Sequence, residues 1–173
     1  MTRKQQALVA QIPRLRRYAN ALTGNPALAD DLVQSCLDRA LTRLHLWREG
    51  TNMRAWLITM LRNLHVSHLR HLSRHPEGNP VALESEMLGT TPPSQGQALE
   101  IQDIDRAVAL LPDEQRQVVL LIGLEELSYK ETAEVLGIPM GTVMSRLSRG
   151  REQLRSLMQG ENRQNKPSLR RVK

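Results

Sequence analysis

The chain has 173 residues, of which 40% are hydrophobic and 24% charged, and its formal net charge is +6. This length allows one or two small domains, and no apolar run approaches the roughly 18 residues of a membrane-spanning helix. The single cysteine excludes a disulfide framework and fits a reducing, cytoplasmic location, and the early basic residues do not fit a secretory signal.

Charge is unevenly distributed along the chain. Residues 1–75 carry a net charge of +8 and residues 136–173 carry +7, whereas residues 76–98 carry −3 and residues 99–135 carry −6. Two basic segments on either side of an acidic middle predict two contacts with a polyanion. Solvated helix faces are the alternative explanation of this pattern.

Residues 1–75 are expected to form a helical domain, because apolar residues recur at helical spacing in three stretches. The three apolar faces comprise Leu8, Ile12, Leu15, Ala19 and Leu22; Leu28, Leu32, Val33, Cys36, Leu37, Ala40, Leu41 and Leu44; and Trp56, Leu57, Met60, Leu61 and Leu64. Asn25 before Pro26 is the N-cap signal of the second helix, and Thr51-Asn52 caps the third. We interpret Cys36 as a small buried apolar residue.

Residues 76–98 hold four of the nine prolines, three glycines and few large apolar side chains. This composition predicts an exposed, flexible, acidic linker. A second helical domain is expected over residues 99–159, followed by a disordered basic tail over residues 160–173. The predicted fold class is therefore all-α, with two small helical domains joined by the linker.

The second domain begins with one helix whose apolar face is Ile101, Ile104, Val108 and Leu111. Pro112-Asp113-Glu114 then begins another helix, with carboxylates favourably placed near its N-terminus. The next segment, residues 128–158, has the spacing of a helix–turn–helix.

Three features mark that motif. Ser128 and Glu131 fit a capping box at the start of its first helix. Gly137 suits a turn position with positive φ. Pro139 is expected to begin the second helix.

The second helix of the motif has two chemically different faces. At about 100° per residue, Val143, Leu147 and Leu154 gather on one side. The other side carries Thr142, Ser145, Arg146 and Arg149. Arginine can donate two hydrogen bonds to guanine O6 and N7 in the major groove, and hydroxyls can reach bases or phosphates. These four residues are candidates for reading DNA, and a solvated amphipathic helix is the alternative.

With LPDEQRQVVLL at 111–121, the helix–turn–helix resembles the fourth conserved region of bacterial sigma factors. ADDLVQSCLDRAL at 29–41 resembles the second-region helix that docks on core RNA polymerase. NMRAWLITMLRNLHVSHLRH at 52–71 resembles the segment that reads and opens the −10 element. The order of the two blocks, with a short linker, is typical of the extracytoplasmic-function group, and GTNMRAWL resembles its alphaproteobacterial general-stress branch.

The resemblance implies a sigma factor, which binds core RNA polymerase, directs it to promoter DNA, has no catalytic residues or cofactor of its own, and does not insert into membranes. An anti-sigma factor is its expected regulator. The implied polymerase contacts are Asp31, Leu32 and Gln34, with Leu32 mostly in the core. The implied −10 contacts are Arg62, Asn63, Ser67 and Arg70, and the −35 contacts are Thr142, Ser145, Arg146 and Arg149.

Three other functions fit parts of the sequence. A self-sufficient helix–turn–helix regulator would dimerise, and no dimer seam is evident. A sigma mimic that sequesters an anti-sigma factor would, in this family, be fused to a receiver domain. A helical metal enzyme could use His68, His71 and His75, which fall within about 60° on a helix, although no carboxylate or thiolate lies close in sequence. A phosphate-facing surface that charges at lower pH is the alternative for these histidines.

Overall fold

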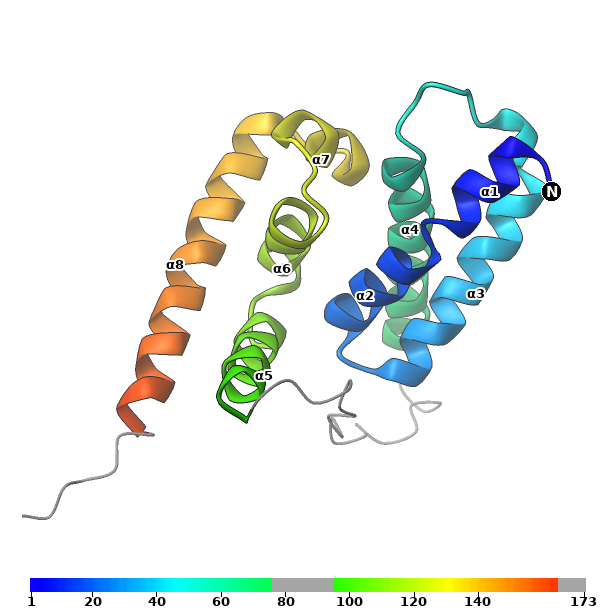
Figure 1. Cartoon of the computed structure of the whole chain (residues 1–173). Helices are drawn as coiled ribbons and strands as arrows, with labels where there is room; N and C mark the ends of the chain where they lie inside the picture. The colour runs from blue at the N-terminus through cyan, green and yellow to red at the C-terminus, as the bar shows by residue number, and fades with distance from the viewer. Residues whose placement is uncertain (76–94, 165–173) are drawn as a thin grey trace, which may run out of the picture.

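The computed structural model describes residues 1–75 and 95–164, with side chains described over 1–75 and 102–159. Every regular element in these ranges is helical (Figure 1), which confirms the all-α prediction. The elements are α1 (Arg3–Val9), α2 (Ile12–Thr23), α3 (Pro26–Thr42), the 3-10 turn η1 (Leu44–Leu46), α4 (Met53–Arg74), α5 (Gln95–Ala109), α6 (Asp113–Val119), the π-helical turn η3 (Leu120–Leu124), α7 (Tyr129–Leu136) and α8 (Met140–Gln164). None of the helices in the described ranges combines the length and apolar character needed to cross a membrane.

The ends of the expected linker and tail differ from the helix bounds. Residues 76–94 of the linker and 165–173 of the tail lie outside the described residues. Helix α5 already begins at Gln95, before the expected end of the linker, and α8 continues to Gln164, inside the expected tail.

The first predicted helix is in fact two helices, α1 and α2, which break at Ala10 and Gln11. Pro13 explains the break, because its ring nitrogen has no hydrogen to donate to the carbonyl of Val9 and proline is tolerated only in the first turn of a helix. Leu8 and Leu15 are nevertheless both buried, so the two short helices keep the predicted inward face.

Helices α2, α3 and α4 pack together as the N-terminal half, residues 1–75. Both predicted caps are present, since the side chain of Asn25 accepts a hydrogen bond from the amide of Leu28 and that of Asn52 accepts one from Ala55. Cys36 is fully buried and its Sγ donates to the carbonyl of Leu57 at 3.4 Å. This burial confirms the interpretation of Cys36 as a small buried apolar residue, and it raises the pKa of the thiol to about 12.

Helices α5 to α8 form the C-terminal half, residues 95–164, and contain the predicted helix–turn–helix in α7 and α8. Ser128 Oγ accepts from the Glu131 amide at 3.1 Å, and Glu131 Oε2 accepts from the Ser128 amide at 2.9 Å, so the capping box is complete. Gly137 ends α7 with φ 65°, as its place in the turn predicted. The carbonyl of Pro139 accepts the first amides of α8.

The predicted apolar face of α5 is only partly right. Val108 and Leu111 are buried, whereas Ile104 is exposed and the side chain of Ile101 lies outside the described residues. Ala107, beside Val108, is fully buried instead. The buried face of α5 therefore includes Ala107 and Val108 but not Ile104, unlike the predicted face.

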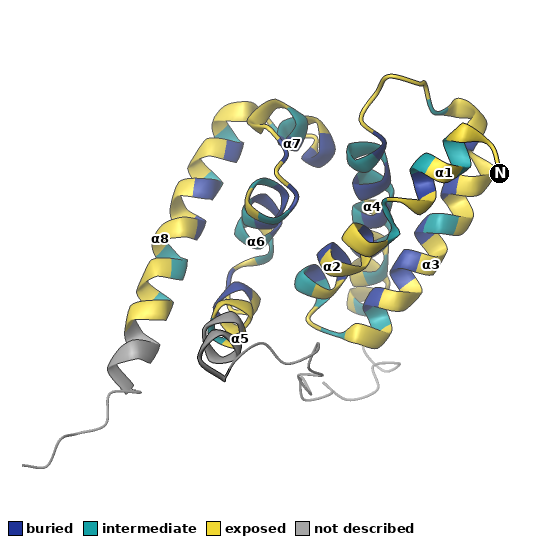
Figure 2. Ribbon diagram, in the orientation of Figure 1, coloured by how far each residue is buried: buried dark blue, intermediate teal, exposed yellow. Residues whose placement is uncertain are grey.

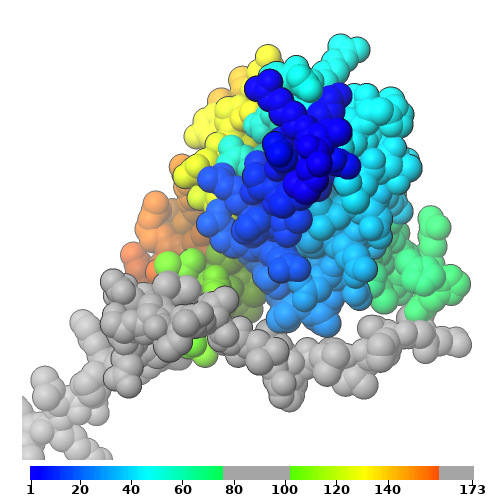
Figure 3. Space-filling view, turned by 45° about the vertical axis from the view of Figure 1, so that its right-hand side comes forward, coloured from blue at the N-terminus to red at the C-terminus, as the bar shows by residue number. Residues whose placement is uncertain are grey.

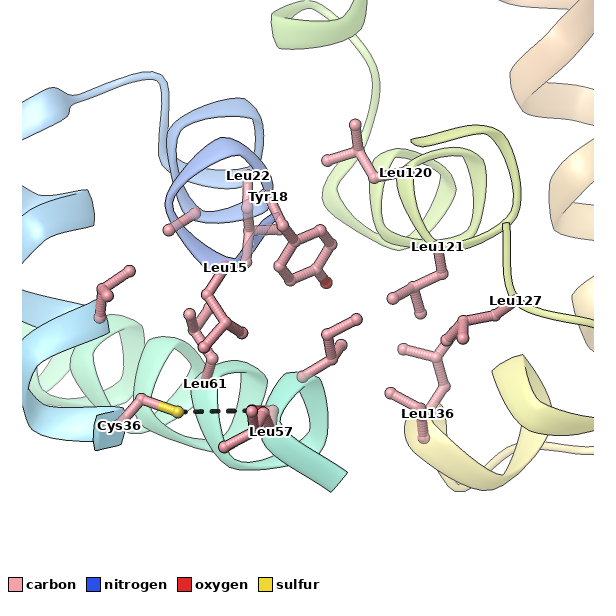
Figure 4. Packing of buried hydrophobic residues seen from close by; sticks show 14 of the residues in the cluster. Leu15, Tyr18, Leu22, Cys36, Leu57, Leu61, Leu120, Leu121, Leu127 and Leu136 are labelled. Atoms are coloured by element: carbon pink, nitrogen blue, oxygen red, sulfur yellow. Dashed lines mark hydrogen bonds between the residues drawn. The ribbon is translucent and has the colours of Figure 1, made fainter. Parts of the chain in front are cut away.

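The two halves pack against each other along a contact that we call the seam, formed by α2 and α4 on one side and α5, α6, η3 and α7 on the other. One hydrophobic cluster runs through both halves, and Figure 4 shows Tyr18 and Leu57 facing Leu121 and Leu136 across it. In the space-filling view the surface of α7 (yellow) abuts the N-terminal half (Figure 3). The two-domain organisation agrees with prediction, but this packing was not predicted.

Candidate nucleic-acid interface

The residues on α8 divide as its periodicity predicted. Val143 and Leu147 are buried, Ser145 and Arg149 are exposed, and Thr142 is half-buried. Figure 2 shows the buried side of α8 turned toward α6 and its exposed side turned away from the rest of the molecule. The outer face of α8 is therefore open to a large partner such as a DNA duplex.

Gly150 determines how closely α8 approaches α6. A Cβ atom at this position would lie 2.8 Å from Val119 Cγ2 and 3.5 Å from Gln115 Cβ. Only glycine fits this crossing without displacing its neighbours. This role could not be predicted from the sequence, because a glycine inside a helical pattern does not itself reveal which helix crosses there.

Among the four predicted DNA-reading residues, Arg146 forms an ion pair with another helix. Its Nη2 lies 2.9 Å from Glu114 Oε2 in the first turn of α6, and only 24% of its side chain is exposed. Glu114 lies at the start of a helix, as predicted, but nothing in the sequence indicates that it contacts Arg146.

Three of the four predicted −10 residues share one exposed face of α4. Asn63, Ser67 and Arg70 recur at positions i, i+4 and i+7 and are all exposed. Arg62 is half-buried and lies in the seam, where its Nε donates to Gln117 Oε1 at 3.0 Å. Gln117 in turn donates to the Asp113 carboxylate at 2.6 Å, so Arg62 belongs to a polar network in the seam.

The predicted polymerase-contacting residues lie on α3. Asp31 and Gln34 are exposed, whereas Leu32 is 6% exposed and belongs to the core. The expectation that Leu32 is mostly a core residue is confirmed. The two polar side chains are the ones available to a partner.

The histidines of α4 differ in their surroundings. His65 is buried in the seam, and burial lowers its pKa. The His71 and His75 rings lie 4.9 Å apart at the exposed end of the helix. Within residues 1–75 and 102–159, no three His, Cys, Asp or Glu side chains gather closely enough to hold a metal ion.

Both halves match known sigma factor domains. Residues 101–154 match sigma-70 region 4, and residues 8–62 match the sigma2 domain of PhyR. The chain is 36% identical over 151 residues, 87% of its length, to the ECF RNA polymerase sigma factor EcfG of Rhodopseudomonas palustris, of which it covers 82%. The chain belongs to the ECF sigma factors. As a member of that family it directs transcription initiation and is not an enzyme.

Two solved structures share the fold of this chain. The sigma factor RpoE of Bartonella quintana, solved in complex with the anti-sigma factor NepR, matches this ECF sigma factor with a TM-score of 0.78 and 33% identity, over 90% of this chain and 96% of that one. The anti-anti-sigma factor PhyR of the same organism, also solved with NepR, shares the fold with a TM-score of 0.56 at 14% identity. This sigma factor covers 49% of that PhyR chain.

Proposed function

We propose that this sigma factor binds core RNA polymerase through Asp31 and Gln34 on α3 and reads the −35 element through α8. The observation that carries the proposal is the two-faced α8, which buries Val143 and Leu147 and leaves Arg149 exposed on the outer face. A rigid helix of this kind fits the major groove, where arginine distinguishes guanine from the other bases.

We assign the −10 element to the exposed face of α4. An enzyme or factor that extrudes a base must offset an unstacking cost of a few kcal/mol with polar contacts. The amide of Asn63, the hydroxyl of Ser67 and the guanidinium of Arg70 supply hydrogen-bonding groups and a positive charge on one face. Arg62 stands apart from these exposed groups, because it is half-buried and its Nε donates to Gln117 Oε1.

The relatives suggest the branch and the regulator. Similarity to EcfG and to a sigma factor that was solved with NepR supports a general-stress role in the cytoplasm, with a NepR-like anti-sigma factor as the partner that holds the protein inactive. Such a partner should form a stable complex with the purified full chain. Failure of a NepR-like protein to co-elute with it would argue against this branch.

A sigma mimic is the second candidate, favoured by the match of residues 8–62 to the sigma2 domain of PhyR. A mimic binds the anti-sigma factor without binding polymerase, so gel filtration with core RNA polymerase at low salt separates the two functions. Co-elution with the polymerase supports the sigma factor. Binding to a NepR-like protein alone would support the mimic.

The assignment of residues is tested by two variants of the reconstituted holoenzyme. Arg149→Ala should weaken binding to the preferred −35 sequence by about 1–3 kcal/mol and relax selection at one base pair, because a bidentate base contact is lost. Asn63→Ala should leave −35 binding unchanged and reduce promoter opening, measured by permanganate reactivity of unpaired thymines.

Arg155→Ala is the control for both variants, since Arg155 is an exposed cation of α8 that pairs with Glu152 on its own helix. It should lower affinity for all duplexes alike without changing base preference. If Arg149→Ala also lowers affinity for every sequence equally, Arg149 contacts only phosphates and the assignment is wrong.

A further inference from the structure

Helix α6 supplies a carboxylate to the DNA-reading helix. Glu114 lies in the first turn of α6, and its Oε2 is 2.9 Å from Nη2 of Arg146 on α8. The side chain of Glu114 is 70% exposed, while that of Arg146 is 24% exposed. The Arg146 side chain is therefore mostly buried, and it forms an ion pair with the Glu114 carboxylate, which remains exposed.

Stability alone does not account for this pair. Glu114 is 70% exposed, so solvent screens the pair, and surface ion pairs typically contribute only about 0–1 kcal/mol to folding. The position of α8 on α6 is already set by buried Val143 and Leu147 and by the close crossing at Gly150. What the carboxylate restricts is the arginine side chain, which otherwise samples many rotamers.

The geometry also leaves Arg146 able to bind a second acceptor. An arginine has five N–H donors in a planar fork, and the contact to Glu114 uses the Nη2 end. The remaining donors can still address a pair of acceptors such as guanine O6 and N7. A fork held in one orientation loses less entropy on binding than a free one.

We propose that Glu114 is a positioning residue for −35 recognition: it holds the Arg146 fork in the orientation that reads one base pair. The proposal rests on the proposed function of α8. It also has an electrostatic consequence, because a carboxylate at the surface beside the DNA-reading face repels phosphates. Glu114 should therefore lower affinity for all duplexes slightly while raising discrimination among them.

The experiment uses the full chain assembled with core RNA polymerase. Selection from a duplex library randomised over both promoter elements first yields the wild-type preference. Binding is then compared between the preferred −35 sequence, its single-base variants and unselected duplex. The proteins compared are the wild type, Arg146→Ala, Glu114→Gln, Glu114→Asp, the double variant of Arg146→Ala with Glu114→Gln, and Glu152→Gln.

Glu152→Gln is the matched control, because Glu152 is 71% exposed and forms a 2.7 Å ion pair with Arg155 within α8. It removes the same charge from the same half of the molecule. It should leave base discrimination unchanged. A change in discrimination that both glutamine variants share would be a net-charge effect and would overturn the role of Glu114.

Glu114→Gln should reduce discrimination about twofold to fivefold at the base pair that Arg146→Ala affects, with affinity for unselected duplex equal or higher. Glu114→Asp should recover part of the discrimination, and the double variant should lose no more at that base pair than Arg146→Ala. If Arg146→Ala changes no base preference, both its proposed role and this inference fail. Only the inference on Glu114 fails if Arg146→Ala changes base preference but Glu114→Gln does not. It also fails alone if Glu114→Gln lowers both the affinity for all sequences and the melting temperature.

Discussion

At the scale of single residues, Gly150 allows α8 to pack closely against α6 because it has no side chain. A Cβ here would lie 2.8 Å from Cγ2 of Val119, a β-branched residue with little freedom to move. We expect Gly150→Ala to destabilise the protein, because overpacking costs about 1–3 kcal/mol and the gain in helix propensity returns only about 1 kcal/mol.

Gly141→Ala is the control on the same helix, since a Cβ there has no neighbour within 4 Å. It should leave stability unchanged or raise it. Urea denaturation measures the free energy of unfolding of both variants. Adding Val119→Ala to Gly150→Ala should restore part of the stability that Gly150→Ala loses. Equal effects of the two alanine substitutions would show that the crossing is not tight.

His65 is a second residue with a measurable consequence. Burial lowers its pKa; Asp113 opposes the shift, and His68 and Arg116 add to it. The unfolded chain therefore takes up the proton first, and the folded state loses stability as pH falls below the ordinary histidine pKa of about 6.5 toward the lowered pKa of the folded state. Burial raises the pKa of Glu125, so the folded state takes up this proton more readily than the unfolded chain. The contribution of Glu125 to stability therefore rises as pH falls, opposite to that of His65.

The measurement compares the free energy of unfolding of wild type and His65→Gln across this pH range. The wild type should lose stability more steeply, and the difference isolates His65 from Glu125. His71→Gln, at an exposed site on the same helix, should follow the wild type. Parallel curves for wild type and His65→Gln would contradict the assignment.

At the scale of elements, two helix caps are joined across the seam. Asn52 caps α4 and donates through Nδ2 to Glu131 Oε1 at 2.7 Å, while Glu131 Oε2 closes the capping box of α7. These hydrogen bonds lower the pKa of Glu131, with the bond from the Ser128 amide as the main cause. The start of α4 and the start of α7 are therefore stabilised by one shared carboxylate.

This sharing predicts that the two caps are energetically coupled. Ser128→Ala should cost about 1 kcal/mol of stability through the lost cap. In a double-mutant cycle, Asn52→Asp and Glu131→Gln should be non-additive, because Asp keeps the cap of α4 but cannot donate to Glu131. Additive free energies of unfolding would show that the bond across the seam contributes nothing.

At the scale of the whole molecule, the seam joins the two halves through polar contacts and one hydrophobic cluster. Arg116 donates to the carbonyls of Ala109 and Leu111 at 2.8 Å and to that of Leu22 at 3.3 Å, so it ties the end of α5 to α2. Arg17 on α2 donates across the seam to the carbonyl of Leu124 in η3. These polar bonds surround a hydrophobic cluster that neither half completes alone.

We therefore expect Leu121→Ala, which truncates a fully buried residue of this cluster, to cost about 2–5 kcal/mol. Amide hydrogen exchange should show reduced protection in α2 and α4 as well as in α6 to α8. Leu147→Ala, on the buried face of α8, is the control and should affect α2 and α4 less. Loss of protection confined to α5–α8 after Leu121→Ala would mean that the halves fold independently.

The sequence by itself determined most features that depend on residues close together in the chain, although the break at Pro13 between α1 and α2 was not predicted. Apolar spacing predicted the helices, Asn25, Asn52 and Ser128 predicted their caps, and Gly137 predicted the turn of the helix–turn–helix. The outward side of α8 was predicted because its own period places Val143 and Leu147 opposite Arg149. These features follow from backbone hydrogen bonding and side-chain direction within one or two turns.

Only the tertiary structure decided which polar side chains of α4 and α8 remain exposed and which contact another helix. Arg62 and His65 enter the seam, and Arg146 meets Glu114, because separate segments approach in space. The period of one helix reveals its apolar side but not which polar residues a second helix will cover. Packing between distant segments settles that, and it separates the exposed Arg149 and Asn63 from the engaged Arg146 and Arg62.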